Sequence, residues 1–277
     1  GDLDLYVASG GYEFNLGDEG LQDRLYVNDG AGSFSLTASL PDLKTSNSSV
    51  LPHDFDGDGD LDLFVGGRVL PGAYPFEPKS YLLENKDGSF VDVVKEVAPE
   101  LEYLGMITDG VWVNLDKDEA LELVVVGEWM SIHVFDAEGG KMIDKTEEYG
   151  LQDQKGWWQS ISANVLSEGQ VELFVGNVGK NIKHKASMEK PFHVYASDFD
   201  KNNSVDIILA KYYKDKQVPV RGKDCTTEQM PFMAEKFETF DEFASTDIQN
   251  MLGEGIDEAK HFETTTFASK LIRIDNS

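Results

Sequence analysis

The sequence predicts an all-β protein: a partial β-propeller of about four four-stranded blades, with a C-terminal helical insert. Two repeating sequence units predict the propeller. One is an acidic loop that runs into an apolar strand, as in GDLDLYVASGG (1–11) and GDLDLFVGG (59–67). The other is a pair of alternating apolar runs around a glycine turn, at 23–40 and 80–97, which is typical of a β-hairpin. One unit of each kind supplies four strands, as a propeller blade requires.

Weaker copies of the acidic loop set the length of each blade. The last acids of the five copies are Asp4, Asp62, Glu122, Glu172 and Asp206. Their intervals are 58, 60, 50 and 34 residues. Because the last interval is too short for a blade, we expect the hairpin over 192–213 to supply the outer two strands of the blade that begins near Trp157. We expect the first blade to lack its opening strand.

The pattern becomes helical from Thr226 to about Phe262. The stretches TTEQ (226–229) and TDIQ (246–249) have the spacing of a capping box. The apolar stripe of this region is Ile248, Met251, Leu252, Ile256, Ala259 and Phe262. We therefore interpret 1–277 as one propeller fragment that contains a helical insert over 226–262. Since the chain opens in the middle of a repeat, we expect it to be a piece of a longer protein.

Composition excludes several classes of partner. The chain has 51 acidic against 24 basic residues and a net charge of −27. Nucleic acid and anionic membrane surfaces both need a basic protein, so neither is expected as a partner, whereas cations are favoured. The single cysteine, Cys225, allows neither an internal disulfide nor a cysteine zinc site. No apolar run reaches the roughly 18 residues that membrane insertion requires.

The stretch DFDGDGDLD (54–62) has the spacing of a metal-binding loop. Side chains at positions 1, 3, 5 and 9 can converge on one point, position 7 can add its backbone carbonyl, and glycine at position 6 permits the sharp turn. The residues concerned are Asp54, Asp56, Asp58, Asp60 and Asp62, with Gly59 at the turn. Carboxylates so spaced repel one another without a cation, and an all-oxygen set favours Ca²⁺. The alternative is a solvated Asp/Gly turn.

The other copies match this pattern less completely. Loop 198–206 retains Asp198, Asp200, Asn202, Ser204 and Asp206, with Asn203 at the turn. Loop 114–122 retains Asn114, Asp116, Asp118 and Glu122, but Glu119 replaces the glycine. The sequence leaves open whether loop 114–122 binds metal. In 164–172, Leu166 stands at position 3, and we expect no metal there.

The pattern DxDxDGxxDhxV resembles the FG-GAP/VCBS repeat, the calcium-loop propeller unit also found in integrin α-chains. The stretches at 108–130, 155–161, 175–187 and 218–237 resemble the large VCBS-repeat proteins of Bacteroidetes and, more distantly, the cartilage-acidic-protein-like propellers. The resemblance implies a calcium-binding propeller that is secreted or attached to the cell surface. It implies little about biochemical activity.

Blade geometry predicts a ligand face opposite the calcium loops. Segments that follow the second strand of each blade emerge there, and rigid aromatic loops with a few charges suit a protein or glycan ligand. The candidate residues are Arg68, Tyr74, Trp129, Trp158 and Lys180. The alternative is that the tryptophans pack between blades and that Lys180 lies in a solvated loop.

The predicted function is a calcium-stabilised, exported propeller that serves as a binding or scaffolding module. No HExxH, GxSxG or phosphate-loop motif is present, so we assign no catalytic residue. The alternative is a propeller-type glycan hydrolase or lyase that acts at the aromatic face. Paired carboxylates for such chemistry would be hidden among the 51 acids.

Overall fold

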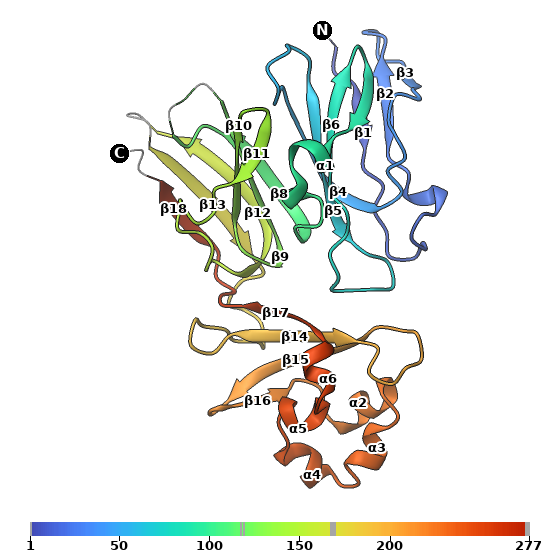
Figure 1. The fold of residues 1–277 in the computed structure, drawn as a ribbon, viewed down its shortest axis with the longest axis vertical. Coiled ribbons are helices and arrows are strands. Elements are labelled where there is room, and N and C mark those ends of the chain that lie inside the picture. The colour runs from blue at the N-terminus through green and yellow to red at the C-terminus, as the bar shows by residue number, and fades with distance from the viewer. Residues whose placement is uncertain (1, 117, 119, 167–169, 275–277) are drawn as a thin grey trace.

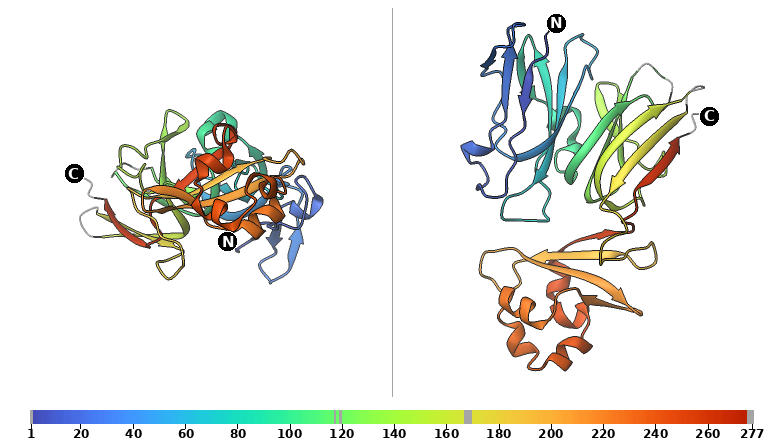
Figure 2. Two further views of the ribbon diagram at one scale, coloured as in Figure 1. Left: turned by 90° about the horizontal axis from the view of Figure 1, so that it is seen from below. Right: turned by 180° about the vertical axis from the view of Figure 1, so that it is seen from behind.

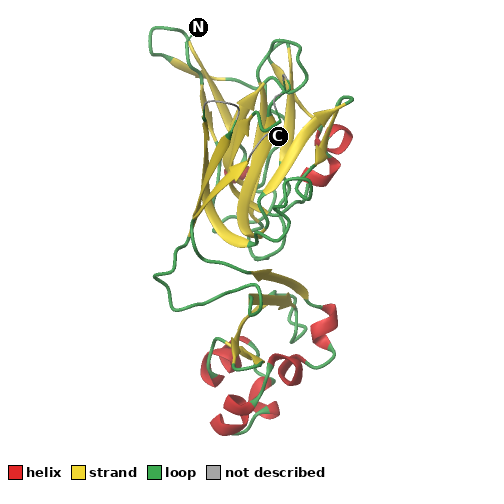
Figure 3. Cartoon of the chain, turned by 90° about the vertical axis from the view of Figure 1, so that its left-hand side faces the viewer, coloured by secondary structure: helices red, strands yellow, loops and turns green. Residues whose placement is uncertain are grey.

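The structure is a computed structural model, and it describes residues 2–116, 118, 120–166 and 170–274. The strands form four β-sheets and the helices are few and short, which confirms the predicted all-β class (Figure 1). Three sheets form an upper unit, and the fourth forms a lower unit with most of the short helices (Figure 2, Figure 3).

The first two sheets follow the order of the chain. Their strand orders are β1-β2-β3 and β4-β5-β6-β7, and every pair is antiparallel. The strands are β1 (Leu5–Val7), β2 (Arg24–Asn28), β3 (Phe34–Leu36), β4 (Ser46–His53), β5 (Asp62–Val69), β6 (Tyr81–Lys86) and β7 (Ser89–Asp92). The short helices beside them are η1 (Glu19–Leu21), α1 (Val94–Val97) and η2 (Pro99–Leu101).

The first sheet holds the second, third and fourth strands of the repeat. The N–H of Asn28 on β2 donates to Asp4 Oδ1 at 2.9 Å, just before β1. In the second sheet the N–H of Asn85 on β6 donates in the same way to Asp62 Oδ1 at 2.8 Å, at the start of β5. Strand β1 is therefore the counterpart of β5.

The third sheet combines two repeats. Its order is β11-β10-β9-β12-β13-β18, and β8 also pairs with β9. Strand β9 meets β12 through two residue pairs, Met130 with Gly156 and Glu128 with Trp157. The strands are β8 (Met106–Val113), β9 (Glu122–Met130), β10 (His133–Glu138), β11 (Lys141–Asp144), β12 (Gly156–Val165), β13 (Val171–Asn177) and β18 (Lys270–Ile274). The sheet is thus a four-stranded and a three-stranded set joined at one end.

Apolar cores lie between successive sets of strands. Phe64 on β5 packs in one core with Ile107 on β8 and Leu123 on β9. Trp158 on β12 belongs to the next core together with Val124 on β9. Strand β8 contacts β4, β5 and β12. The sets therefore pack against one another in chain order, each burying the inner strands of its neighbour.

Glycine at the end of the second repeat strand allows close backbone packing. A Cβ on Gly67 of β5 would lie 2.3 Å from the backbone oxygen of Lys79, and one on Gly127 of β9 would lie 2.1 Å from that of Met106. Both distances are far below van der Waals contact. The glycine that follows the apolar run of the repeat is thus required by packing.

The lower unit has its own sheet and core. The sheet order is β16-β15-β14-β17, from β14 (Phe192–Ser197), β15 (Asp206–Tyr213), β16 (Lys216–Pro219) and β17 (Lys260–Thr264). The helices are α2 (Lys223–Gln229), α3 (Met233–Lys236), α4 (Phe240–Ser245), α5 (Ile248–Leu252) and α6 (Gly255–Glu258). Tyr195 and Ile208 of the sheet pack with Met230 and Met251 from the helical segment.

This lower unit is an insertion between two neighbouring strands. Strand β13 pairs with β18, and the N–H of Asn177 donates to Ser269 Oγ at 3.1 Å. The prediction that 192–213 supplies the outer strands of the blade near Trp157 is therefore wrong, because β18 pairs there instead. Alternating apolar residues identify a strand but do not identify its partner when the two lie far apart in sequence.

The helix ends also differ from prediction. Thr226 lies inside α2 and Thr246 follows α4, so neither begins a capping box. The box forms at α4, where Thr239 Oγ1 accepts the N–H of Glu242 at 3.2 Å and Glu242 accepts the N–H of Thr239 at 2.9 Å. Phe262 of the predicted helical stripe lies on β17.

Aromatic rings join the two units. Phe192 of β14 is fully buried, and its ring stacks on that of Trp129 with centroids 6.0 Å apart. Trp157 and Phe267 meet the same ring edge-on, with centroid distances of 5.8 and 5.6 Å and angles between the ring planes of 83° and 65°. This shared core fixes the lower unit against the end of β9 and β12.

Candidate metal centres and the opposite cavity

The loop between β4 and β5 folds around the carboxylate of Asp54. Its Oδ1 accepts the N–H of Gly57 at 2.8 Å, and its Oδ2 accepts the N–H of Gly59 at 3.0 Å. Both glycines have positive φ, 78° and 99°. Glycine adopts this conformation without steric cost, so the loop closes at the turn position that the sequence singles out.

The loop between β14 and β15 repeats this arrangement with other residues. Asp198 accepts the N–H of Asn202 on Oδ1 and the N–H of Asn203 on Oδ2, both at 2.9 Å. Lys201 and Asn203 have φ of 59° and 66°, at the two positions that glycine holds in the first loop. Asparagine tolerates this left-handed conformation better than most residues, which explains how the turn survives without glycine.

The last acid of each loop is buried at the start of a strand. Asp62, Glu122 and Asp206 begin β5, β9 and β15 and are 1%, 0% and 3% exposed. Each carboxylate accepts the N–H of the second loop residue, and the donors are Phe55 at 3.1 Å, Leu115 and Phe199 at 3.1 Å, respectively. The carboxylate at the ninth loop position thus closes each of the three loops by the same hydrogen bond.

Burial makes these last acids costly to ionise. It raises the pKa of Asp62 to about 6 and that of Glu122 to about 7, and it also raises the pKa of Asp206. Neighbouring carboxylates act in the same direction, such as Asp56 on Asp62 and Asp116 on Glu122. A bound cation would remove this penalty, because it stabilises the ionised form.

Three acidic groups have the size of a single-ion site. In each, one ligand atom from each of three side chains lies within 4.8 Å of the others. The groups are Asp54, Asp56 and Asp62; Asp116, Asp118 and Glu122; and Asp198, Asp200 and Asp206. Glu122 Oε1 is buried and has no hydrogen-bond partner among the described residues. The residues fit a hard cation, since oxygen ligands suit Ca²⁺.

The fifth loop position carries a further oxygen. Asp58 accepts the N–H of the residue two positions on at 2.8 Å, Asn202 does so at 2.8 Å and Asp118 at 2.7 Å. The position-5 side chain therefore makes the same local hydrogen bond in all three loops, although Asp58 is not among the three acids of its loop that lie within 4.8 Å of one another.

The other predicted loop residues are more peripheral. Asp60 and Ser204 occupy position 7 and are exposed. Asn114 Nδ2 donates to the backbone oxygen of Asp118. Glu119 lies outside the described residues, as do residues 167–169 of the loop for which no metal is expected.

A carboxylate that the sequence pattern did not predict lies beside loop 114–122. Asp136 on β10 has its Oδ1 buried with no hydrogen-bond partner in the described chain. Burial raises its pKa, and the charges of Asp116 and Asp118 raise it further. A strand partner of the loop supplies this acid, so the loop spacing contains no signal for it.

The loops occupy two places in the molecule. Those that precede β5 and β9 lie at the upper end of the sheets, on the side where the chain begins (Figure 1). Loop 198–206 lies in the inserted lower unit. Segments that follow the second repeat strands emerge at the opposite end of the upper sheets, facing the lower unit.

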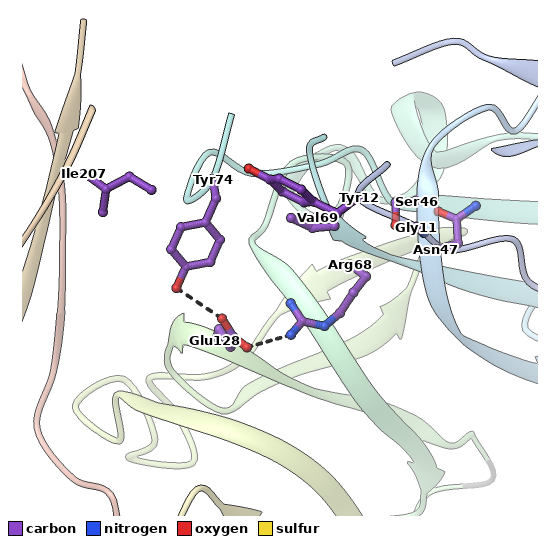
Figure 4. A pocket seen from close by; sticks show the side chains of 10 residues that line it. Gly11, Tyr12, Ser46, Asn47, Arg68, Val69, Tyr74, Glu128 and Ile207 are labelled. Atoms are coloured by element: carbon purple, nitrogen blue, oxygen red, sulfur yellow. Dashed lines mark hydrogen bonds and ion pairs between the residues drawn. The ribbon is translucent and has the colours of Figure 1, made fainter. Parts of the chain in front are cut away.

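A cavity of about 500 Å³ opens at that opposite end (Figure 4). Arg68 Nη2 lies 2.6 Å from Glu128 Oε1, and Tyr74 Oη donates to Glu128 Oε2 at 3.2 Å. Trp129 Nε1 donates to Tyr74 Oη at 2.5 Å. The chain of bonds orients Arg68 and Glu128 toward the cavity, whose rim includes the exposed ring of Tyr12.

The five predicted ligand residues are divided between different places. Arg68 and Tyr74 line the cavity, and Trp129 supports them from behind at 3% exposure. Trp158 is fully buried in the core, with Nε1 bonded to the backbone of Gln154, and presents no surface to a ligand. Lys180 is exposed in the lower unit. The sequence analysis did not predict Glu128 as a ligand residue, although it directly precedes Trp129 in the sequence.

Trp129 itself has an unusual backbone. Its φ is 61°, a value that a bulky side chain rarely adopts. The conformation turns the indole between Tyr74 and Phe192. Backbone of this kind persists only where surrounding contacts impose it, and it is concentrated at functional sites.

Several histidines make polar contacts away from the cavity. His133 Nδ1 lies 3.0 Å from Asp144 across β10 and β11. His193 Nδ1 lies 2.9 Å from His261 Nε2 in the lower unit. Burial and the charge of His261 lower the pKa of His193 to about 4, so this ring is neutral at physiological pH.

Comparison with known families finds a match over the first part of the chain. Residues 1–65 match the FG-GAP-like repeat family. The matched FG-GAP-like segment contains the first sheet, loop 54–62 and the beginning of β5. No curated protein matches the chain. No helix in the described part of the chain is long and apolar enough to cross a membrane.

Proposed function

We propose that the chain is a calcium-stabilised propeller module that binds a protein or glycan ligand at the cavity of Arg68 and Glu128. One observation carries the metal part: three loops place their carboxylates within 4.8 Å of one another and close on a buried last acid. The FG-GAP-like match over residues 1–65, which contains one of these loops, supports the propeller. Export to the extracellular space or cell surface follows from the family resemblance and belongs to this proposal.

Calcium would act on stability. Loops 54–62, 114–122 and 198–206 would each hold one ion through the side chains named above, and the ion would supply the opposing charge. Because the sites form only when the chain folds, metal binding energy adds to folding energy. Variable coordination by carboxylate and carbonyl oxygens favours Ca²⁺ over Mg²⁺, which prefers a strict octahedron with several waters.

The cavity supplies the binding chemistry. Arg68 offers donors and Glu128 offers acceptors, side by side, and their side chains are 30% and 17% exposed. Such a pair matches vicinal hydroxyls or a peptide backbone, while the ring of Tyr12 offers an apolar face. The bonds from Trp129 to Tyr74 and from Tyr74 to Glu128 pre-organise the pair, which reduces the entropy lost on binding.

An array of glycans and peptides, probed with the labelled protein in CaCl₂, tests the ligand proposal. Arg68→Ala should abolish any specific signal, and Arg273→Ala, at an exposed arginine on β18, should preserve it. Equal loss in both variants would contradict the cavity. Turnover of a glycan that Glu128→Gln abolishes would favour the alternative function, a glycan hydrolase or lyase.

A further inference from the structure

The sheet of the lower unit has two ends of opposite character. Strands β14 and β15 are joined by the acidic loop 198–206 at one end. At the other end lie the segment 178–191, which leads into β14, and the turn between β15 and β16 (Figure 1). The strands are six and eight residues long, so the ends are separated by roughly 20 Å at about 3.3 Å per residue. We call the second one the basic end.

Lysine is concentrated at the basic end. Residues 178–221 hold nine basic against five acidic side chains, whereas the rest of the chain holds 15 against 46. Seven lysines at this end are exposed: Lys180, Lys183, Lys185, Lys190, Lys211, Lys214 and Lys216. This end is thus a positive surface on a strongly acidic protein.

The two segments of the basic end form one surface. Lys190 Nζ donates to the backbone oxygen of Lys214 and lies 3.3 Å from Asp215, which fixes segment 178–191 to the β15–β16 turn. Both Lys183 and Lys211 lower the pKa of His184, after the larger effect of burial, so both lie near that ring. Charges from the two segments therefore act at the same place.

The composition of this surface selects its partner. Protein interfaces are depleted in lysine and built around an apolar core. The large apolar side chains exposed at the basic end are Met188 and Tyr213, at 58% and 64%. Lysine keeps its hydration and acts as a mobile point charge, which suits charges spaced along a flexible polymer. The ring of Tyr213, with Lys214 Nζ 5.6 Å from its centroid, adds a flat surface for a sugar ring.

We propose that the basic end binds a linear polyanionic glycan through the carboxylates or sulfates of its sugars. This site is separate from the cavity of Arg68 and Glu128, and it does not depend on what binds there. The acidity of the remaining surface repels the same polymer, so the interaction is confined to this end and weakens as salt rises.

Binding of hyaluronan and of heparin, measured by biolayer interferometry in 50 mM NaCl and 2 mM CaCl₂, tests the proposal. Hyaluronan reports recognition of carboxylates, and heparin reports recognition of sulfates. The triple variant Lys180→Gln, Lys183→Gln, Lys185→Gln should weaken binding about tenfold, which corresponds to roughly 0.5 kcal/mol per lysine, the energy of an exposed ion pair. The matched control Lys86→Gln, Lys95→Gln, Lys141→Gln removes three exposed lysines of the upper unit and should bind like the wild type.

Several results would overturn the proposal. One is the absence of saturable binding to both polyanions by the wild-type protein. Another is equal weakening in the control variant, and a third is equal binding of neutral dextran. Binding of poly-aspartate as tight as that of either glycan would replace the glycan with an acidic protein partner. An unchanged melting temperature of both triple variants shows that the comparison reports the surface rather than the fold.

Discussion

Glu122→Gln should stabilise the metal-free protein and weaken its response to calcium. The carboxylate is 0% exposed, one oxygen accepts the N–H of Leu115, and the other has no partner among the described residues. Glutamine retains an acceptor for Leu115 and removes the buried charge. The two effects of the substitution therefore have opposite signs, which a merely structural role for the side chain would not produce.

The size of the first effect follows from the pKa. Burial raises the pKa of Glu122 from 4.5 to about 7. At 1.36 kcal/mol per unit, the ionised group therefore destabilises the fold by at most about 3 kcal/mol at pH 8. Because the folded pKa is the higher one, stability is retained below pH 4.5 and lost as pH rises through 7. The unfolding entropy, about 2.1 cal/mol/K per residue, converts this difference to roughly 5 °C for 277 residues.

The second effect follows from mass action. Calcium at 100 times its dissociation constant stabilises by about 2.7 kcal/mol per site, again roughly 5 °C. Differential scanning calorimetry at pH 5 and pH 8, in EDTA and in CaCl₂, measures both effects. Without metal, Glu122→Gln should melt within about 2 °C of the wild type at pH 5 and roughly 5 °C higher at pH 8. Its calcium-induced increase should be about 5 °C smaller.

The exposed residue Glu235 on α3 provides the control. Glu235→Gln should change neither the pH dependence nor the calcium response. The reasoning would be refuted if Glu122→Gln melted below the wild type in EDTA at pH 8. It would equally be refuted if the calcium-induced increase were the same in both proteins.

Three further predictions concern the fold. Phe192→Ala, at the contact between the units, should cost about 3–5 kcal/mol in urea unfolding, and a loss below roughly 1 kcal/mol would contradict that core. Gly127→Ala should destabilise by about 1–3 kcal/mol, because its Cβ would lie 2.1 Å from a backbone oxygen, while Gly222→Ala, with no atom within 4 Å, should not. Replacing 178–268 by a short Gly/Ser loop should preserve the β13–β18 pairing and the upper sheets. A disordered chain in circular dichroism would contradict the claim that the lower unit is an insertion between these two strands.

The loops could be predicted because their geometry is local. Asp54 and Gly59 lie five residues apart, and the same hydrogen bonds recur in 198–206 with Asn203 at the turn. Spacing alone fixes which groups converge in such a loop. The all-β class was predictable for the same reason, since alternation and turn residues act over a few positions.

Long-range pairing was not predictable from these patterns. Strand β18 pairs with β13 across the whole lower unit, so the short interval between the last two acidic loops reflects an insertion rather than a shortened blade. The cavity joins Arg68 and Tyr74 of one repeat to Glu128 of the next, and Asp136 reaches loop 114–122 from a neighbouring strand. Each of these contacts depends on how the sheets pack, which no local motif records.

Calcium titration of the chelator-treated protein by isothermal calorimetry tests the central claim most directly. The three acidic groups predict saturable binding with a stoichiometry near three ions per chain. Asp62→Asn and Asp206→Asn should each remove one ion from that number, because each replaces the buried acid that closes its loop. No heat of binding up to millimolar calcium, or a stoichiometry that neither variant changes, would contradict the claim that these loops are metal centres.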